Sequence, residues 1–153
     1  MNIIRSTLQK EVSPKVFYNL AFILLGGIFI FSGVGKLVKA PGIENIWLTG
    51  ILGSQLTGIL WKALPYVEII IGILLVLKFR IKLVAWFAMG LILKFIINNV
   101  WLIANGKGLE TCGECLGWGI DLWPVGSLYI DLLMMGLLLI GSSFYKKYAE
   151  AKA

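Results

Sequence analysis

The chain has 153 residues, of which 59% are hydrophobic and 14% are charged, with a formal net charge of +6. Soluble domains carry roughly 25% charged residues, so this composition argues against an ordinary soluble domain and predicts one small membrane domain. The basic residues stand at the ends of apolar blocks, which favours anchoring at a lipid bilayer over binding to nucleic acid. The chain has two cysteines and no histidine, and a zinc site normally takes four ligands, so no metal is expected.

Four apolar blocks are each long enough to cross a hydrocarbon core, which needs about 20 residues of helix. They predict an all-α fold, an integral membrane four-helix bundle that forms a single transmembrane domain over residues 1–153. The expected spans are residues 16–37, 61–77, 83–104 and 126–145. The segment 43–60 is mixed in character and contains several glycines, and we expect it to lie in the membrane interface.

Four spans place both termini on one side of the membrane, and the basic residues predict which side. Of the 14 lysines and arginines, nine lie in the termini and in the link between the second and third spans, four lie on the opposite side, and Lys94 is inside the third span. By the positive-inside rule, this asymmetry predicts cytoplasmic N- and C-termini. The expected location is the inner or plasma membrane, with the loop 105–125 on the extracytoplasmic side, where disulfides persist.

Ionisable residues inside a membrane are costly, and they usually face a partner or a cavity. Apart from Lys62, which the charge count places on the outer side, the expected spans contain four charged residues: Lys36, Glu68, Lys94 and Asp131. All four fall in the outer half of the bundle, and Lys36 is near enough to the outer edge to extend its ammonium group to the interface. Glu68 and Lys94 lie at similar depth on neighbouring spans, so we expect them to pair directly or through Asn98 or Asp131.

Other polar residues follow the helical repeat around these charges. Lys94, Asn98, Trp101 and Asn105 share one face of the third span. Two interpretations stay open for this stripe and the charges near it. Buried ion pairs fix the register of the helices, or the polar groups form a pocket, a proton path or a site for a cofactor head group.

The expected extracytoplasmic loop carries the run Cys112-Gly-Glu-Cys115. Two cysteines three positions apart can close and reopen a small disulfide ring, which is the chemistry of dithiol exchange. A ring this small adds modest entropic stabilisation, which weakens the case for a purely structural bridge. The nearby acids Glu110, Glu114 and Asp121 disfavour a thiolate, which predicts a comparatively reducing pair. The spacing alone leaves redox chemistry, an inert disulfide and two separate thiols open.

Several motifs between residues 16 and 145 resemble a known family of membrane proteins. The run FIFSGVGKLVKAP resembles the end of the first helix of DoxX-like proteins, and PYVEIIIGILLVL resembles their second helix, with Glu68 as its acidic residue. The cysteine loop followed by LYIDLLMM resembles the MauE branch of that superfamily, in which a Cys-Gly-Cys-Phe-Gly stretch precedes the last helix. This chain departs from that stretch by a glutamate inserted between the cysteines. The resemblance implies a four-helix membrane protein in extracytoplasmic thiol and disulfide traffic, often beside thioredoxin-like partners, and DoxX relatives are linked to quinone-coupled sulfur oxidation.

The leading hypothesis is a membrane thiol–disulfide redox protein, which as an enzyme would be a quinone-linked thiol–disulfide oxidoreductase. Cys112 is the expected attacking or attacked thiol, Cys115 is the resolving thiol, and an extracytoplasmic thioredoxin-like protein is the expected partner. A quinone is the candidate cofactor, and these residues are expected to hold its head group: Lys94, Asn98, Trp101, Trp118 and Trp123. The alternative is a non-catalytic subunit or scaffold of a redox or sulfur-oxidising complex, with a structural disulfide. A small transporter is the least favoured interpretation, since no inverted repeat is evident.

Overall fold

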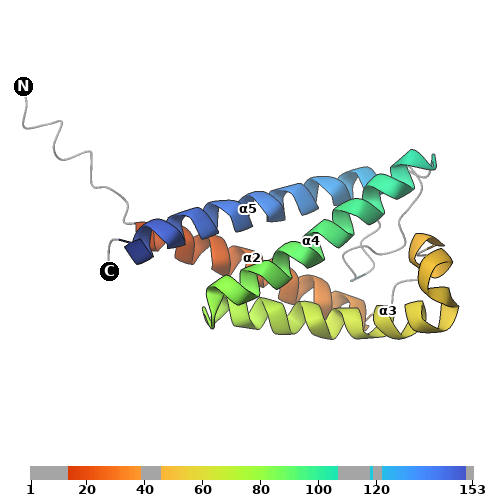
Figure 1. Cartoon of the computed structure of the whole chain (residues 1–153), viewed down its shortest axis with the longest axis horizontal. Coiled ribbons are helices and arrows are strands. Elements are labelled where there is room, and N and C mark those ends of the chain that lie inside the picture. Colours follow the sequence, from red (N-terminus) through yellow and green to blue (C-terminus); the bar gives the residue numbers. More distant parts are fainter. Residues whose placement is uncertain (1–13, 39–45, 107–117, 119–121, 151–153) are drawn as a thin grey trace, which may run out of the picture.

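The computed structural model describes residues 14–38, 46–106, 118 and 122–150, and these residues form an all-α structure. Its helices are α2 (Pro14–Val38), α3 (Ile46–Val76), α4 (Ile81–Ala104) and α5 (Pro124–Glu150), shown in Figure 1. All four are long and apolar enough to cross a membrane. The prediction of an all-α membrane bundle of four helices is therefore confirmed.

Two helices extend well beyond the expected spans. α3 begins at Ile46, inside the segment that the sequence assigns to the membrane interface, and it continues to Val76. Gly53 interrupts this helix with φ 76° and ψ 160°, a conformation that essentially only glycine adopts. α5 continues to Glu150, past the expected end of its span at Tyr145. The expected spans were defined by runs of apolar residues, which indicate only the part of a helix that lies in the hydrocarbon core. Helical turns outside the hydrocarbon core are therefore not included in those spans.

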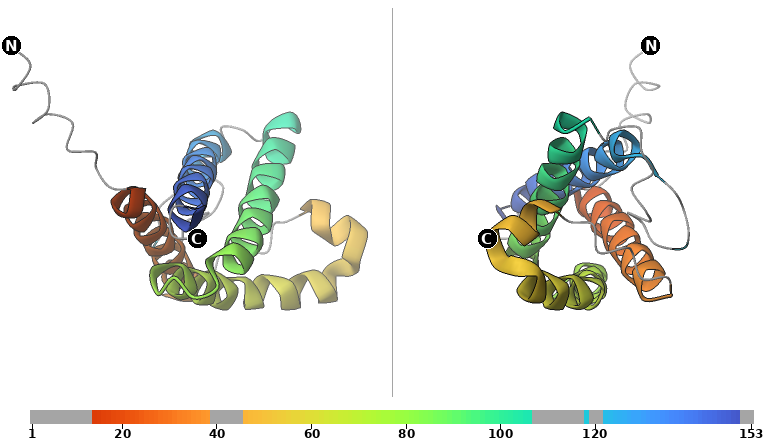
Figure 2. Two further views of the ribbon diagram at one scale, coloured as in Figure 1. Left: turned by 60° about the vertical axis from the view of Figure 1, so that its left-hand side comes forward. Right: turned by 90° about the vertical axis from the view of Figure 1, so that its right-hand side faces the viewer.

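Consecutive helices run antiparallel, and α5 closes the bundle against α2, as Figures 1 and 2 show. α4 packs closely against α5 and more sparsely against α3. The start of α2 meets the end of α5, where the rings of Phe17 and Phe144 stack with their centroids 5.0 Å apart and Tyr18 packs edge-on against Tyr145. The helix ends nearest the two termini therefore lie together. The prediction that they are cytoplasmic remains a prediction.

The core consists of apolar side chains that all four helices turn inward. Its fully buried members are Phe22, Leu25, Leu75, Ala88, Ile92 and Leu138. The outward faces are apolar too, and large side chains such as Trp86 and Phe87 are 71% and 63% exposed. A helix that is hydrophobic on every side suits a lipid environment, so these outer faces fit contact with a bilayer.

α2 and α3 touch through their backbones at glycine residues. A Cβ atom added to Gly26 would lie 2.6 Å from the carbonyl oxygen of Gly72, and one added to Gly33 would lie 2.7 Å from the carbonyl oxygen of Pro65. Small residues allow membrane helices to approach this closely. The contact fixes the register of α2 against α3 at the depth of the buried charges.

Candidate functional site

An ion pair between α2 and α3 lies at the centre of the site. Lys36 Nζ is 2.5 Å from Glu68 Oε1, and the two side chains are 4% and 0% exposed. Of the pairings expected for Glu68 and Lys94, the direct one is wrong, because Glu68 pairs with Lys36. The Lys36 ammonium group, which is near enough to the outer edge to extend to the interface, is turned into the bundle instead. Side chains on a helix lean toward its N-terminus, and Lys36 is near the C-terminal end of α2. Its long side chain therefore reaches back into the bundle, where Glu68 lies.

Lys94 lies against aromatic rings. Its Nζ is 4.5 Å from the ring centroid of Trp61 and 4.7 Å from that of Phe95. Lys36 Nζ is 4.6 Å from the same Phe95 ring, so this ring contacts both ammonium groups. A cation over an aromatic face gains about 2 kcal/mol when it is desolvated. The rings thus compensate in part for an ammonium group that has no hydrogen-bond partner among the described residues.

Several buried polar atoms in this half of the bundle have no hydrogen-bond partner within the described part of the chain. They are Trp61 Nε1, Glu68 Oε2, Lys94 Nζ and Asn99 Oδ1. A buried polar group without a partner costs about 1–3 kcal/mol, and buried groups in proteins are normally paired. Two of these atoms are donors on the facing helices α3 and α4, which makes this region a candidate site for a group that carries acceptor oxygens.

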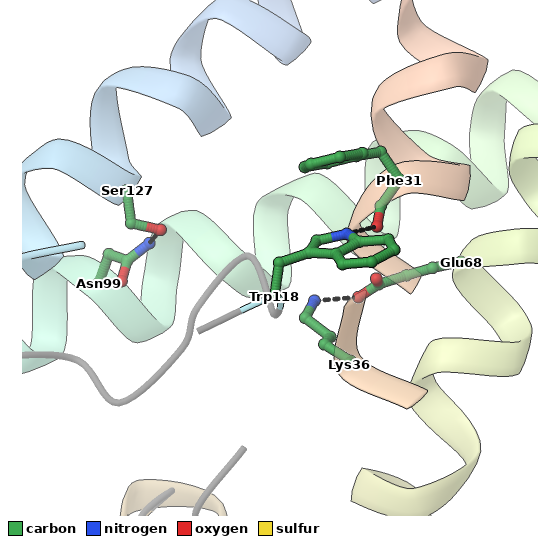
Figure 3. Close-up of polar contacts among 6 residues, drawn as sticks. All are labelled: Phe31, Lys36, Glu68, Asn99, Trp118 and Ser127. Carbon is green, nitrogen blue, oxygen red and sulfur yellow. Dashed lines mark hydrogen bonds and ion pairs between the residues drawn. The ribbon is translucent and has the colours of Figure 1, made fainter. Parts of the chain in front are cut away.

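A second polar cluster joins α4 to α5. Asn99 Nδ2 donates to Asp131 Oδ2 at 2.7 Å and to Ser127 Oγ at 3.2 Å, and Figure 3 shows the bond to Ser127. Asn99 and Asp131 are 3% and 6% exposed. Helical spacing predicts a role for Asn98, which shares a stripe with Lys94, and does not predict one for Asn99. The presence of two adjacent asparagines, Asn98 and Asn99, within an apolar span was the sequence feature that could have indicated a role for Asn99.

Trp118, in the cysteine loop, is bonded to the C-terminal half of α2 (Figure 3). Its indole Nε1–H donates to the carbonyl oxygen of Phe31 at 2.8 Å, and its backbone N–H donates to that of Gly35 at 3.4 Å. The Trp118 and Phe31 rings stack with their centroids 5.4 Å apart. Trp118 is therefore attached to α2 within one residue of Lys36.

The structure brings together part of the predicted site. Lys36 and Glu68 meet, and Lys94 contacts the Phe95 ring that Lys36 also contacts. Asp131 belongs to the second cluster. The remaining predicted head-group residues differ in burial: Asn98 is buried, Trp101 is half-buried, and Trp118 and Trp123 are exposed. Cys112 and Cys115 lie outside the described residues. The aromatic contacts of Trp61 and Phe95 were not predicted, because sequence spacing does not show which faces of neighbouring helices meet.

Comparison with protein-family models matches residues 14–144 to the family described as methylamine utilisation protein MauE. The matched region takes in α2, α3 and α4 and most of α5. No curated protein and no solved structure matches the chain.

Proposed function

The chain belongs to the MauE family, and on that premise we propose that it is a membrane thiol–disulfide exchange protein. Its dithiol is Cys112 and Cys115, on the extracytoplasmic side of the inner or plasma membrane, and its partner is a thioredoxin-like protein in the same compartment. The observation that carries the proposal is the hydrogen bonding to α2 of Trp118, which follows Cys115 by three residues in the sequence.

The proposed exchange is a pair of thiolate displacements. The Cys112 thiolate attacks the disulfide of an oxidised partner, which forms a mixed disulfide and releases one partner thiolate. The Cys115 thiolate then attacks the Cys112 sulfur, which closes the Cys112–Cys115 bond and releases the second partner thiolate. The chain loses two electrons and two protons and the partner gains them. The same steps in reverse oxidise a reduced partner.

We further assign a quinone head group to the donors between α3 and α4. A quinone presents carbonyl oxygens on a flat ring, and its chemistry is to accept or supply the two electrons of a dithiol. Lys94 Nζ and Trp61 Nε1 are buried donors without acceptors among the described residues, and the rings of Trp61 and Phe95 offer flat apolar surfaces. These residues would bind and orient the carbonyl oxygens. The other proposed head-group residues are Asn98, Trp101, Trp118 and Trp123.

Trapping the mixed disulfide tests the exchange. In Cys115→Ser the resolving thiol is absent, so the intermediate stalls, and we expect a covalent adduct between Cys112 and an extracytoplasmic thioredoxin-like protein. The measurement is a non-reducing gel of acid-quenched membranes, followed by mass spectrometry of any band that reductant removes. A membrane-impermeant thiol reagent applied to intact cells should label the remaining cysteine, which checks the compartment.

Cys112→Ser and the double serine variant are the matched controls. Cys112→Ser should trap far less adduct, and the double variant should trap none. If neither single variant yields an adduct, and the wild-type disulfide stays closed across the accessible potential range, the exchange proposal is wrong. A non-catalytic scaffold with a structural disulfide would then be the better account.

A further inference from the structure

The Glu68 carboxylate uses only one of its two oxygens in the ion pair with Lys36. Lys36 Nζ donates to Oε1 at 2.5 Å, and Figure 3 shows this contact. Oε2 is buried and has no hydrogen-bond partner in the part of the chain that the structure describes. A buried acceptor left unpaired is costly, and more so when it belongs to a charged group. Oε2 is therefore a candidate acceptor for a donor that a ligand brings.

The unpaired donors lie in the same cluster of side chains. Trp61 precedes Glu68 by seven residues, so the two share one face of α3. Lys94 Nζ is 4.5 Å from the Trp61 ring, and Trp61 Nε1 and Lys94 Nζ are both buried without an acceptor among the described residues. The Phe95 ring contacts the ammonium group of Lys94 at 4.7 Å and that of Lys36 at 4.6 Å. The cluster thus has a donor end, at Trp61 and Lys94, and an acceptor end, at Glu68.

The cluster of donors and acceptor distinguishes the two redox forms of a quinone. The oxidised form presents carbonyl oxygens alone, so it can pair with the donors and leaves Glu68 Oε2 unpaired. The reduced form, a quinol, carries hydroxyl groups that both accept and donate. Seven residues of helix separate Trp61 from Glu68 by about 10 Å along the axis. A six-membered ring with oxygens at opposite ends, and a hydrogen bond of about 2.8 Å at each end, spans a similar length.

We propose that Glu68 makes this site selective for the reduced head group: the quinol accepts from Trp61 and Lys94 and donates one hydroxyl to Glu68 Oε2. This inference rests on the quinone head group assigned to the site in the proposed function. Lys36 holds the carboxylate in place through Oε1, which leaves Oε2 for the ligand. A hydrogen bond to an ionised group is stronger than one between neutral groups, so the preference for the quinol should be large.

The test is the ratio of two dissociation constants. Tetramethyl-benzoquinone and the corresponding hydroquinone are titrated separately, by calorimetry under argon, into the full chain in detergent micelles. The cysteines are first reduced and alkylated, so that no electron exchange changes the redox form of the probe. We expect the hydroquinone to bind about tenfold more tightly than the quinone, which is the effect of one hydrogen bond to a charged group. The dimethyl ether of the hydroquinone keeps both oxygens and cannot donate, so it should lose this advantage.

The double variant Glu68→Gln with Lys36→Met removes the carboxylate without leaving a buried ammonium group beside it. Its amide can accept or donate, so the two redox forms should bind with similar constants. Asp131→Asn makes the same acid-to-amide change at the other buried carboxylate and should keep the wild-type ratio. Lys94→Met should weaken both forms by about tenfold, because both carry oxygens that accept, and should not remove the preference for the hydroquinone.

A purely structural role for Glu68 predicts the wild-type ratio in the folded fraction of the double variant, isolated by size exclusion. If the double variant does not fold, the wild-type chain with the hydroquinone and its dimethyl ether decides, since that comparison removes the donor from the ligand. Wild-type protein that binds both redox forms equally, or prefers the quinone, overturns this inference alone. Wild-type protein that binds neither form overturns the quinone site as well, whereas the thiol exchange is judged separately by the mixed-disulfide trap.

Discussion

The α2–α3 and α4–α5 contacts each bury one carboxylate, and they compensate for it differently. Between α2 and α3, Glu68 has an ammonium group at 2.5 Å. Between α4 and α5, Asp131 accepts a hydrogen bond of 2.7 Å from the uncharged amide of Asn99. Removing the carboxylate strands the Lys36 ammonium charge in the first contact and only the uncharged Asn99 amide in the second. We therefore expect replacement of Glu68 by a neutral side chain to lower the free energy of unfolding strongly. We expect replacement of Asp131 by a neutral side chain to lower it little.

The largest expected effect is that of Glu68→Gln, which removes the ion pair between Lys36 and Glu68. It leaves the Lys36 ammonium group buried without its carboxylate, and breaking a buried pair in this way costs about 3–5 kcal/mol. The free energy of unfolding, measured by far-ultraviolet circular dichroism in mixed detergent micelles, should fall by that amount. Replacing both residues, as in Glu68→Gln with Lys36→Met, should recover part of the loss.

The exposed pair of Lys146 and Glu150 is the control. Its atoms are 3.9 Å apart and its side chains are 79% and 65% exposed, so Glu150→Gln should produce no measurable change. A Glu68→Gln protein as stable as wild type, with nothing for the double variant to recover, would mean that the two buried charges are not coupled.

A smaller effect is expected at the glycine contact that draws α2 and α3 together. In Gly26→Ala the new methyl group meets the backbone of Gly72, which cannot rotate away, so the helices must separate at a cost of about 1–3 kcal/mol. Gly27→Ala is a control one residue away, where an added Cβ meets nothing within 4 Å. Because alanine favours helix over glycine, Gly27→Ala should be neutral or stabilising by up to about 1 kcal/mol. Equal unfolding free energies for the two variants would show that close backbone contact does not hold this interface.

The smallest effect is expected from Asp131→Asn, the same acid-to-amide change made in the other contact. The new side chain keeps an oxygen that accepts from Asn99, and no ammonium group is stranded within hydrogen-bonding distance among the described residues. The loss should be about 1 kcal/mol or less in the same unfolding assay. An Asp131→Asn protein as destabilised as Glu68→Gln would show that Asp131 also depends on a charged partner, and the contrast between the two contacts would fail.

The four helices were predictable because hydrophobic length is a property of the chain itself. Any run of about 20 apolar residues must place its backbone in a helix to cross a bilayer. The bend at Gly53 was not predictable in the same way. The glycines of residues 50–58 lower helix propensity, yet the structure keeps α3 helical on both sides of Gly53.

The candidate site was predictable in its composition and only partly in its pairing. Burial of charges was evident because Glu68, Lys94 and Asp131 interrupt apolar runs. Their partners depend on how the helices rotate and lean, which periodicity does not define. Glu68 and Lys94 lie at similar depth, which is why the sequence predicts that they pair. Glu68 pairs with Lys36 instead, because the Lys36 side chain points back toward the N-terminus of α2.

The interruption of α3 at Gly53 bears on the thickness of the surrounding lipid. At about 1.5 Å per residue, the 31 residues of α3 would make a straight rod of roughly 46 Å, far longer than a hydrocarbon layer of about 30 Å. Figure 1 shows the first turns of α3 bending away from the rest, and the Thr57 hydroxyl bonds back to the carbonyl oxygen of Gly53 at 2.8 Å. From Gly53 to Val76 the remaining rod is roughly 36 Å, which a modest tilt fits to an ordinary bilayer. The bend thus relieves hydrophobic mismatch, so that the length of α3 does not require an unusually thick membrane.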